Sequence, residues 1–369
     1  MTEETTIVVL AGATGNLGGS IARALLDVPG VALRALTRDD TSESARALAA
    51  IGAQVVRADP TDRDAVRRAT EGAFAVVSAL DHARWDLIAQ RDGQSVAGAL
   101  GERRLECVSA YANVNRAAAS RTPEAFAEVA SRAAAEGFGA VKIAPFDGID
   151  LAGDPGMNAP AALLDAAFAR VAAVRSAIGA DVELMVDCHW RLNAPTALQC
   201  IDALARFDVR WLECPLPETP AFIEPLRALR SRANARGMRV AGCEQMSRVD
   251  AFLPWLRAGA YDVMMPDVKY VGGLLEMLSV ATASQTYGVE CVPHNPSGPI
   301  AHAVSLQVCA AAGLRHLEIQ FRETPHFDTL CAGALPVPVR GVIAVPNAPG
   351  LGVALTSQVI ERLRIDPLH

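Results

Sequence analysis

The chain has no excess of basic residues. Of its 369 residues, 34 are Lys or Arg and 41 are Asp or Glu, which gives a formal net charge of −7. A nucleic-acid-binding protein would show a positive footprint, and none is present. No apolar run reaches the roughly 18 residues that a membrane span requires. The start, Met1 to Glu4, lacks the basic and apolar regions of a signal peptide. We therefore expect a cytoplasmic protein without nucleic-acid or membrane partners.

No Cys-x-x-Cys pair occurs among the eight cysteines. In a chain this long, that usage fits a reducing compartment and buried thiols rather than a disulfide framework. Cys188, Cys214 and Cys243 stand beside candidate site residues, and we interpret them as small apolar spacers on buried strands. With 51% hydrophobic and 20% charged residues, the composition is that of a globular protein with a large core.

A glycine-rich turn stands near the start, in "LAGATGNLGGSIARAL" at residues 10–25. The apolar run before it predicts a buried strand, and an apolar helical period follows it. Gly12, Gly15 and Gly18 stand where a dinucleotide-binding turn needs them, so that backbone N–H groups at a helix start approach a pyrophosphate. Arg38 follows the second predicted strand, where a cation meets the 2′-phosphate of NADP.

This region, residues 1–79, resembles the NmrA-like Rossmann proteins in "GATGNLGG", "RALTRDD" and "VVRADPTD". Its predicted strands are 6–10, 31–37, 54–58 and 73–79. The resemblance stops after four strands, and no Tyr-x-x-x-Lys pair follows for hydride chemistry. Two interpretations remain open: the turn binds NAD(P), or its glycines serve only the turn and helix packing. A dehydrogenase is not expected.

From residue 80 onward, strand-like and helix-like segments alternate. One amphipathic helix lies near Arg84, and helical runs such as "PEAFAEVASRAAAEG" separate the later strands. Eight such strands predict a parallel (β/α)8 barrel of the TIM type. They are 105–110, 140–143, 183–187, 211–213, 239–244, 263–267, 290–293 and 316–320. The predicted domains are 1–79, a helical remnant at 80–104, the barrel with its active site at 105–325, and a return segment at 326–369.

Charged residues recur at the ends of these strands, about one strand-plus-helix unit apart. They are Asp187 and His189, Glu213, Glu244, Asp267, His294 and Glu318. The carboxyl ends of barrel strands meet at the active-site face. Converging buried carboxylates repel one another, and a divalent cation relieves that cost. Three carboxylates on neighbouring strands are suited to Mg²⁺.

The motifs "VDCHWRLN", "WLECPLPE", "AGCEQ", "PDVKYVGG", "PHNPSGP" and "LEIQ" resemble the mandelate racemase branch of the enolase superfamily, over residues 80–369. The resemblance implies that Asp187, Glu213 and Glu244 are the Mg²⁺ ligands and that Asp267 and His294 form a base dyad. It also implies that Glu318 hydrogen-bonds the substrate carboxylate and that Lys142 contacts the substrate. Mg²⁺ would stabilise the enediolate formed when the α-proton leaves. Asp267 would orient His294 and raise its pKa, and Glu318 is expected to be protonated and to donate.

Two departures from the family pattern bear on the reaction. Racemases of this type often carry Lys-x-Lys on the second strand, but this chain has Lys142-Ile143-Ala144. His189 instead stands two residues past a metal ligand, on the inward-facing side by strand alternation. Acid-sugar dehydratases resembling galactonate dehydratase have an acid there that protonates the departing β-hydroxyl. We therefore favour dehydration of an aldonate over racemisation. A purely structural His189 and a non-catalytic, NAD(P)-responsive binding protein are the alternatives.

The substrate is expected to be a small carboxylate, and Arg191 is either a contact for its hydroxyl or carboxylate groups or part of a surface ion pair. Family members normally begin with an α+β capping domain that closes over the barrel. Here only its last helix and its return segment, "GVIAVPNAPGLGV", are recognisable. The Rossmann-like segment stands in place of the rest. Because such barrels often form even-numbered assemblies, we expect a homo-oligomer.

Overall fold

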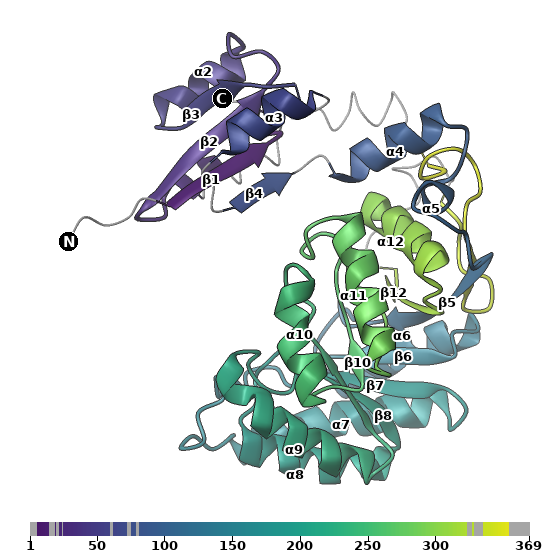
Figure 1. Cartoon of the computed structure of the whole chain (residues 1–369). Coiled ribbons are helices and arrows are strands. Elements are labelled where there is room, and N and C mark those ends of the chain that lie inside the picture. Colours follow the sequence, from purple (N-terminus) through teal and green to yellow (C-terminus); the bar gives the residue numbers. More distant parts are fainter. Residues whose placement is uncertain are drawn as a thin grey trace. The chain divides into compact units, whose positions relative to one another are not determined.

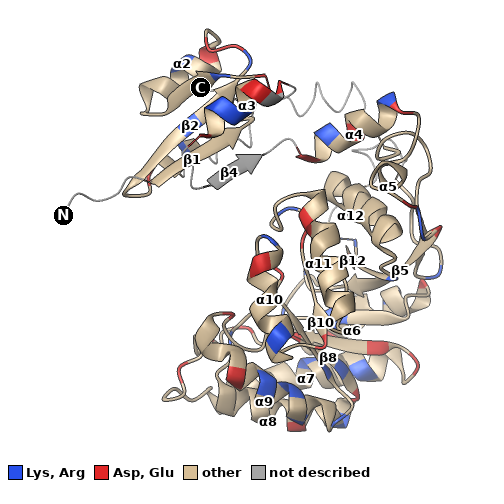
Figure 2. Ribbon diagram, in the orientation of Figure 1, with Lys and Arg blue, Asp and Glu red and all other residues tan. Residues whose placement is uncertain are grey.

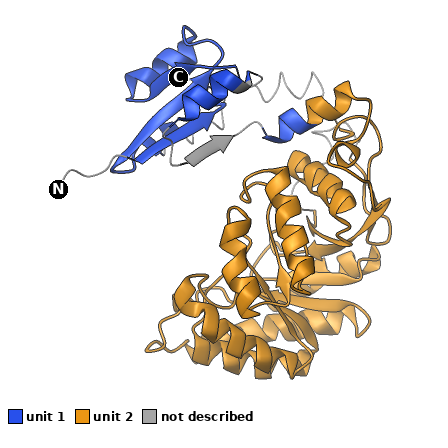
Figure 3. Ribbon diagram, in the orientation of Figure 1, with its two compact units in different colours: residues 1–85, 358–369 blue, residues 86–357 orange. Residues whose placement is uncertain are grey.

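The computed structural model describes residues 6–14, 19, 22–23, 25–59, 62–71, 75–78, 81–322, 327 and 335–353. Two of the predicted nucleotide-binding glycines, Gly15 and Gly18, lie outside these residues. The described chain divides into two compact units with the boundary between Trp85 and Asp86 (Figure 3). Within the described ranges, every helix is too short or too polar to cross a bilayer.

The first unit holds a parallel sheet of four strands in the order β3-β2-β1-β4 (Figure 1). The elements are β1 (Thr6–Ala11), β2 (Val31–Thr37), α2 (Glu43–Ala50), β3 (Gln54–Arg57), α3 (Arg63–Thr70) and β4 (Ala75–Ser78). This is the order of the first four strands of a Rossmann sheet. The four predicted strands are confirmed, with ends shifted by two residues or fewer.

Side-chain alternation along β1 supplies both faces of this sheet. Leu10 belongs to one buried cluster together with Leu33 and Leu48, and Val9 belongs to a second with Leu36. A strand that is buried on both faces reads as a continuous apolar run, which is why "IVVL" predicts a parallel sheet.

The predicted cofactor residues of this unit are only partly described. Gly12 follows β1 directly with φ +81°, a backbone conformation that favours glycine. Arg38 is the first residue after β2, and its side chain is exposed. The two interpretations of the glycine turn therefore both stand.

The second unit is a curled parallel sheet of eight strands in the order β11-β10-β9-β8-β7-β6-β5-β12 (Figure 1). The strands are β5 (Cys107–Asn113), β6 (Ala140–Ile143), β7 (Glu183–Asp187), β8 (Val209–Glu213), β9 (Arg239–Gly242), β10 (Val263–Met264), β11 (Glu290–Cys291) and β12 (His316–Gln320). All eight predicted strands are present, so the barrel prediction is confirmed. Three of them, β6, β7 and β12, have the predicted bounds.

Helices follow the strands and cover the outside of the sheet (Figure 1). They are α6 (Pro123–Ala135), α7 (Ala161–Ile178), α8 (Ala194–Leu204) with η1 (Ala205–Phe207), η2 (Pro220–Phe222) with α9 (Ile223–Asn234), α10 (Val249–Ala258), α11 (Leu274–Thr286) and α12 (Pro299–Ala312). Local sequence sets where several begin. Thr122 caps α6 ahead of a proline, and Asn193 caps α8 by accepting from the backbone N–H of Thr196. Figure 2 shows acidic and basic positions mixed along these helices.

Four strands end at a different residue from the prediction, and β5 and β8 each begin two residues away from their predicted starts. β10 and β11 stop earlier than expected, because Pro266 and Pro293 have no N–H to continue a ladder. The β9 ladder likewise ends at Gly242 instead of residue 244. β5 runs three residues further than predicted, since it pairs with β12 up to Asn113.

No backbone ladder joins β11 to β12 among the described strands. Side chains bridge this seam instead. At its N-terminal end, His316 Nδ1 lies 3.0 Å from a Glu290 oxygen. At its C-terminal end, the backbone N–H of Asn295 donates to Glu318 Oε2 at 3.1 Å, and the Asn295 side-chain amide donates to the Glu318 carbonyl.

The return segment packs beside the helices that precede the barrel. These are α4 (Asp81–Arg91), in which the unit boundary falls, and α5 (Val96–Ala99). The short strand β13 (Val342–Ala344) pairs antiparallel with β5. Beyond it, Gly350 exchanges backbone hydrogen bonds with Gln94 and Val96, and the N–H of Leu351 donates to Asp86. The predicted helical remnant and return segment thus lie against each other.

Candidate active site

Six predicted site residues lie in one buried cluster at the carboxyl ends of the barrel strands. Each of them is 5% exposed or less. They are Lys142, Asp187, Glu213, Glu244, Asp267 and Glu318. Asp187 and Glu213 end adjacent strands and are register partners across the β7–β8 ladder. The prediction from strand ends therefore brings these groups together correctly.

Lys142 lies in the middle of this cluster. Its Nζ is 2.6 Å from Glu213 Oε1 and 3.0 Å from Glu318 Oε1. Burial disfavours the ammonium, but the two carboxylates outweigh it and raise the pKa of Lys142 well above its usual value. The second oxygen of Glu213 accepts a hydrogen bond of 2.9 Å from the indole N–H of Trp211. Lys142 is therefore a fixed internal cation.

Glu318 differs from the prediction in its charge state. Burial alone would raise its pKa, but Lys142, His294 and hydrogen bonds from Asn113 and Asn295 lower it to about 2. The Asn113 amide donates to Oε1 at 2.7 Å. Glu318 is thus an ionised acceptor in this structure, and the expected protonated donor is wrong. The donor to a substrate oxygen would have to be its neighbour Lys142.

The predicted base dyad is assembled. His294 Nδ1 lies 2.8 Å from Asp267 Oδ2, and His294 Nε2 lies 3.4 Å from Glu244 Oε2. His294 is 9% exposed, so one edge of the ring reaches the mouth of the barrel. Lys269 Nζ lies 3.2 Å from the same Asp267 oxygen. Asp267 therefore orients the imidazole, which leaves Nε2 directed toward the carboxylate cluster.

His189 reaches the cluster by a different route from the predicted one. β7 ends at Asp187, and both His189 and Trp190 adopt positive φ, +47° and +58°. Strand alternation therefore does not decide where His189 points. A left-handed turn returns the ring so that Nε2 lies 2.7 Å from Asp187 Oδ2. Burial opposes its ionisation, but the hydrogen bond and charge of Asp187 raise the pKa of His189.

Two of the three predicted metal ligands, Glu213 and Glu244, are costly to ionise where they lie. Burial, with help from neighbouring carboxylates, raises the pKa of Glu244 to about 10 and that of Glu213 to about 7. Within the described ranges, no group of three or more His, Cys, Asp or Glu side chains is arranged to hold a metal ion. Instead, Asp187 and Glu213 are engaged by His189, Lys142 and Trp211. The donor chemistry fits Mg²⁺, because three buried carboxylates offer the hard oxygen ligands that this ion prefers. A bound cation would also offset the repulsion between their negative charges.

Two depressions open on this face. One, of about 130 Å³, includes Asp187, His189 and Arg191 in its wall. The other, of about 400 Å³, lies against Trp190, Glu218 and Gln245. Arg191 thus adjoins the predicted reaction centre, and no ion pair of its side chain is present among the described residues.

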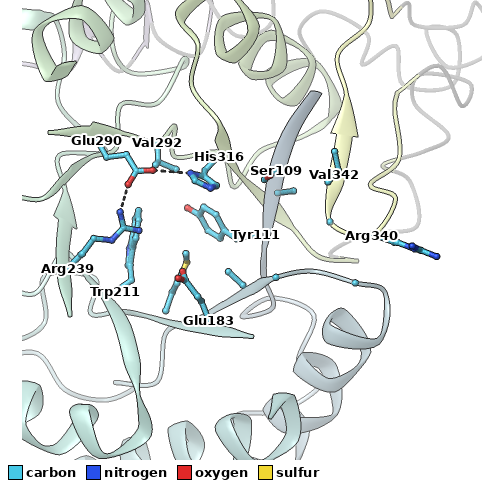
Figure 4. Close-up of a pocket in the computed structure, with 16 residues that line it drawn as sticks. Ser109, Tyr111, Glu183, Trp211, Arg239, Glu290, Val292, His316, Arg340 and Val342 are labelled. Carbon is cyan, nitrogen blue, oxygen red and sulfur yellow. Dashed lines mark hydrogen bonds and ion pairs between the residues drawn. The ribbon is translucent and has the colours of Figure 1, made fainter. Parts of the chain in front are cut away.

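A larger cavity, of about 450 Å³, lies at the opposite end of the barrel (Figure 4). The first residues of several strands surround it, among them Glu183, Arg239, Glu290 and His316. Figure 4 shows Glu290 bridging Arg239 and His316 at its edge. These charges satisfy one another, and the N-terminal face of such barrels serves stability rather than chemistry. We therefore place the candidate active site at the carboxylate cluster and not in the larger cavity.

Sequence reasoning missed three residues of the site. Asn113 was overlooked because the first barrel strand was predicted to end at residue 110. Asn295 follows the predicted base directly, but its role across the β11–β12 seam depends on folding. Lys269 carried a usable signal, since the chain has only two lysines and the other is Lys142.

Two family models match different parts of the chain. Residues 125–359 match the family described as enolase C-terminal domain-like, and residues 3–101 match the NmrA-like family. A D-gluconate dehydratase from Thermoproteus tenax is 32% identical over 81% of this chain, which spans 58% of that relative's length. A D-galactonate dehydratase from Ralstonia nicotianae is 30% identical over 80% of this chain, and the match covers 75% of that relative's length.

Relatives with other names match a similar share of the chain. A D-galactarolactone cycloisomerase from Agrobacterium fabrum is 29% identical over 80% of this chain and 75% of its own. Among solved structures, a mandelate racemase/muconate lactonizing enzyme from a Sulfitobacter species superposes with a TM-score of 0.68 and 26% identity, covering 76% of this chain and 70% of that one. The relatives' names thus include dehydratases and isomerising enzymes.

Proposed function

Because the chain belongs to the enolase C-terminal domain-like family, we propose that it is a Mg²⁺-dependent enzyme that dehydrates a sugar acid. The reaction removes the proton α to the carboxylate of an aldonate and expels the β-hydroxyl as water. The product is a 2-keto-3-deoxy acid. The names of the gluconate and galactonate dehydratase relatives support this substrate class.

The observation that carries the proposal is the contact between His294 and Asp267. With Nδ1–H donating to Asp267 at 2.8 Å, His294 Nε2 holds the lone pair that accepts a proton. This atom faces Glu244 and the carboxylate cluster, where a bound acid would present its α-carbon. Lys142 supplies a fixed positive charge for the substrate carboxylate.

Asp187, Glu213 and Glu244 would hold the metal ion. When bound, Mg²⁺ supplies positive charge that stabilises the carboxylate oxygens as the α-proton leaves. Glu213 now contacts Lys142, and Asp187 contacts His189. These two contacts would have to lengthen for Glu213 and Asp187 to bind the metal ion.

His189 supports dehydration over racemisation. Its contact with Asp187 raises its pKa and so favours the protonated form, which is the form that donates to a departing hydroxyl. Its side chain is 40% exposed at the mouth of the barrel, within reach of a substrate. A two-base racemase would need a second base two residues after Lys142, just past the end of β6, and Ala144 stands at that position.

Incubation with Mg²⁺ and a panel of aldonates in D₂O tests the proposal. Dehydration gives a 2-keto-3-deoxy acid, racemisation gives α-deuterated substrate, and a binding protein gives neither. His294→Asn should eliminate both α-exchange and dehydration. His189→Asn should slow dehydration by about 10²–10⁴-fold while α-exchange continues. Dehydration at the wild-type rate in the His189 variant would restore the racemase interpretation.

A further inference from the structure

The cavity of about 130 Å³ on the carboxyl face begins at the reaction centre, because Asp187 and His189 form one side of it. Its remaining walls come from the segments that follow β5, β6 and β7. Asn115, Asp147 and Arg191 contribute the polar part. All of these residues belong to the barrel unit, so the cavity does not depend on any capping domain.

Arg121 lines this cavity, and all its guanidinium donors are already bound to the protein. Its Nε and Nη2 donate to the two oxygens of Asp147 at 2.7 and 3.0 Å. Its Nη1 donates to the carbonyl and Oδ1 of Asn115, and Nη2 also donates to the carbonyl of Ala144. Every guanidinium N–H is used, and Asp147 balances the charge. Arg121 therefore has nothing left to offer a ligand.

Arg191 is the opposite case. Among the described residues its guanidinium makes one hydrogen bond, from Nη1 to the carbonyl of Ile149 at 3.2 Å. Its backbone is held on both sides, since its N–H donates to Cys188 and its carbonyl accepts from Leu151. The guanidinium is thus carried on a fixed support with most of its donors free to meet a ligand.

The mixture of donors and acceptors decides the class of ligand. Arg191 offers N–H groups, whereas Asp147, which Arg121 holds in place, offers carboxylate oxygens in the same wall. A hydroxyl group both donates and accepts, so it satisfies both kinds of partner. A second carboxylate only accepts, so it would match Arg191 but could donate nothing to the carboxylate oxygens of Asp147, whereas a hydroxyl matches both.

We propose that this cavity is the subsite for the distal hydroxyl groups of an open-chain polyhydroxy monoacid, and that Arg191 determines the preference for such a chain. The inference rests on the proposed function, because it assumes that the carboxylate end of the substrate binds at the Lys142 cluster. Binding of the remote hydroxyls would hold the β-carbon against His189, so its loss should lower kcat as well as raise KM.

The test compares three acids in D₂O with Mg²⁺: the hexonate that the wild-type protein converts fastest, glycerate, which lacks the distal chain, and the corresponding hexarate, which ends in a second carboxylate. The wild type should prefer the hexonate to both others. Arg191→Met should lower kcat/KM for the hexonate by about 10- to 100-fold, the value of one or two hydrogen bonds to a charged group. Glycerate turnover should stay within about twofold, and it serves as the internal measure of folding.

Two further variants sharpen the comparison. Arg191→Lys keeps the charge but loses the planar fork, so it should recover only part of the hexonate rate. Arg227→Met is the matched control, since Arg227 is an exposed arginine of α9 that pairs only with Glu224 among the described residues. This variant should change kcat/KM neither for the hexonate nor for glycerate.

Separate results contradict the subsite and the proposed function. An equal loss on hexonate and glycerate in Arg191→Met would make Arg191 a structural residue, and a preference for the hexarate would make the cavity a carboxylate site. Wild-type hexonate turnover in Arg191→Met would also contradict the subsite. A wild-type protein that neither exchanges nor dehydrates any acid would contradict the proposed function itself.

Discussion

Replacing Lys142 by methionine should destabilise the barrel strongly in the absence of metal. Lys142 is 1% exposed, and its ammonium lies 2.6 Å from Glu213 and 3.0 Å from Glu318, both of which are fully buried. Methionine fills a similar volume but leaves two carboxylates without their cation. Breaking a buried pair in this way costs about 3–5 kcal/mol. The loss should be in the lower part of that range at pH 6 and larger at pH 8.

The pH dependence follows from the direction of the pKa shifts. With Lys142 present, the pKa of Glu318 is about 2, so its ionised form is stable in the fold at neutral pH. Without Lys142, burial raises the folded-state pKa above the unfolded value. The variant then needs a bound proton to remain folded, and it loses stability as pH rises through that raised value.

Urea unfolding in EDTA measures this effect, because EDTA prevents a divalent ion from replacing the ammonium. Lys269→Met is the matched control: Lys269 is 31% exposed and Asp267 keeps its contact with His294 at 2.8 Å, so loss of the Lys269 ion pair should cost less than about 1 kcal/mol. With Mg²⁺ in place of EDTA, the difference in urea midpoint between Lys142→Met and the wild type should become smaller. Equal midpoints for the two lysine variants would refute the reasoning.

Two other outcomes are expected. Glu213→Gln should abolish activity and weaken Mg²⁺ binding by several kcal/mol while the fold survives, because it removes one of three ligand charges; calorimetric titration that finds unchanged Mg²⁺ affinity would reject Glu213 as a ligand. Burial lowers the pKa of His302 to about 4, below its unfolded value near 6.5. The unfolded chain therefore binds the extra proton, and about 2 kcal/mol of stability should be lost between pH 7 and pH 5. In His302→Gln that acid sensitivity should be reduced by the same amount, as followed by urea midpoints at the two pH values.

The sequence alone determined the architecture and the site at the level of strand ends. Apolar runs at regular spacing predicted all eight barrel strands, because a parallel strand buried on both faces has no polar positions to obscure it. The charged residues that close those runs predicted the buried cluster from Asp187 to Glu318. This works because parallel strands in a barrel necessarily end on one face, so position along the chain converts directly into position in space.

Only the tertiary structure decided the charge states and contacts of the residues in this cluster. The pKa of Glu318 depends on Lys142 and Asn113, which come from other strands, so no local pattern could show that it is ionised. His189 reaches Asp187 through a left-handed turn that strand alternation does not describe. The free donors of Arg191 and the saturated donors of Arg121 look alike in the sequence, since both are arginines near strand ends. Hydrogen bonds between segments far apart in the chain distinguish them, and those contacts exist only after folding.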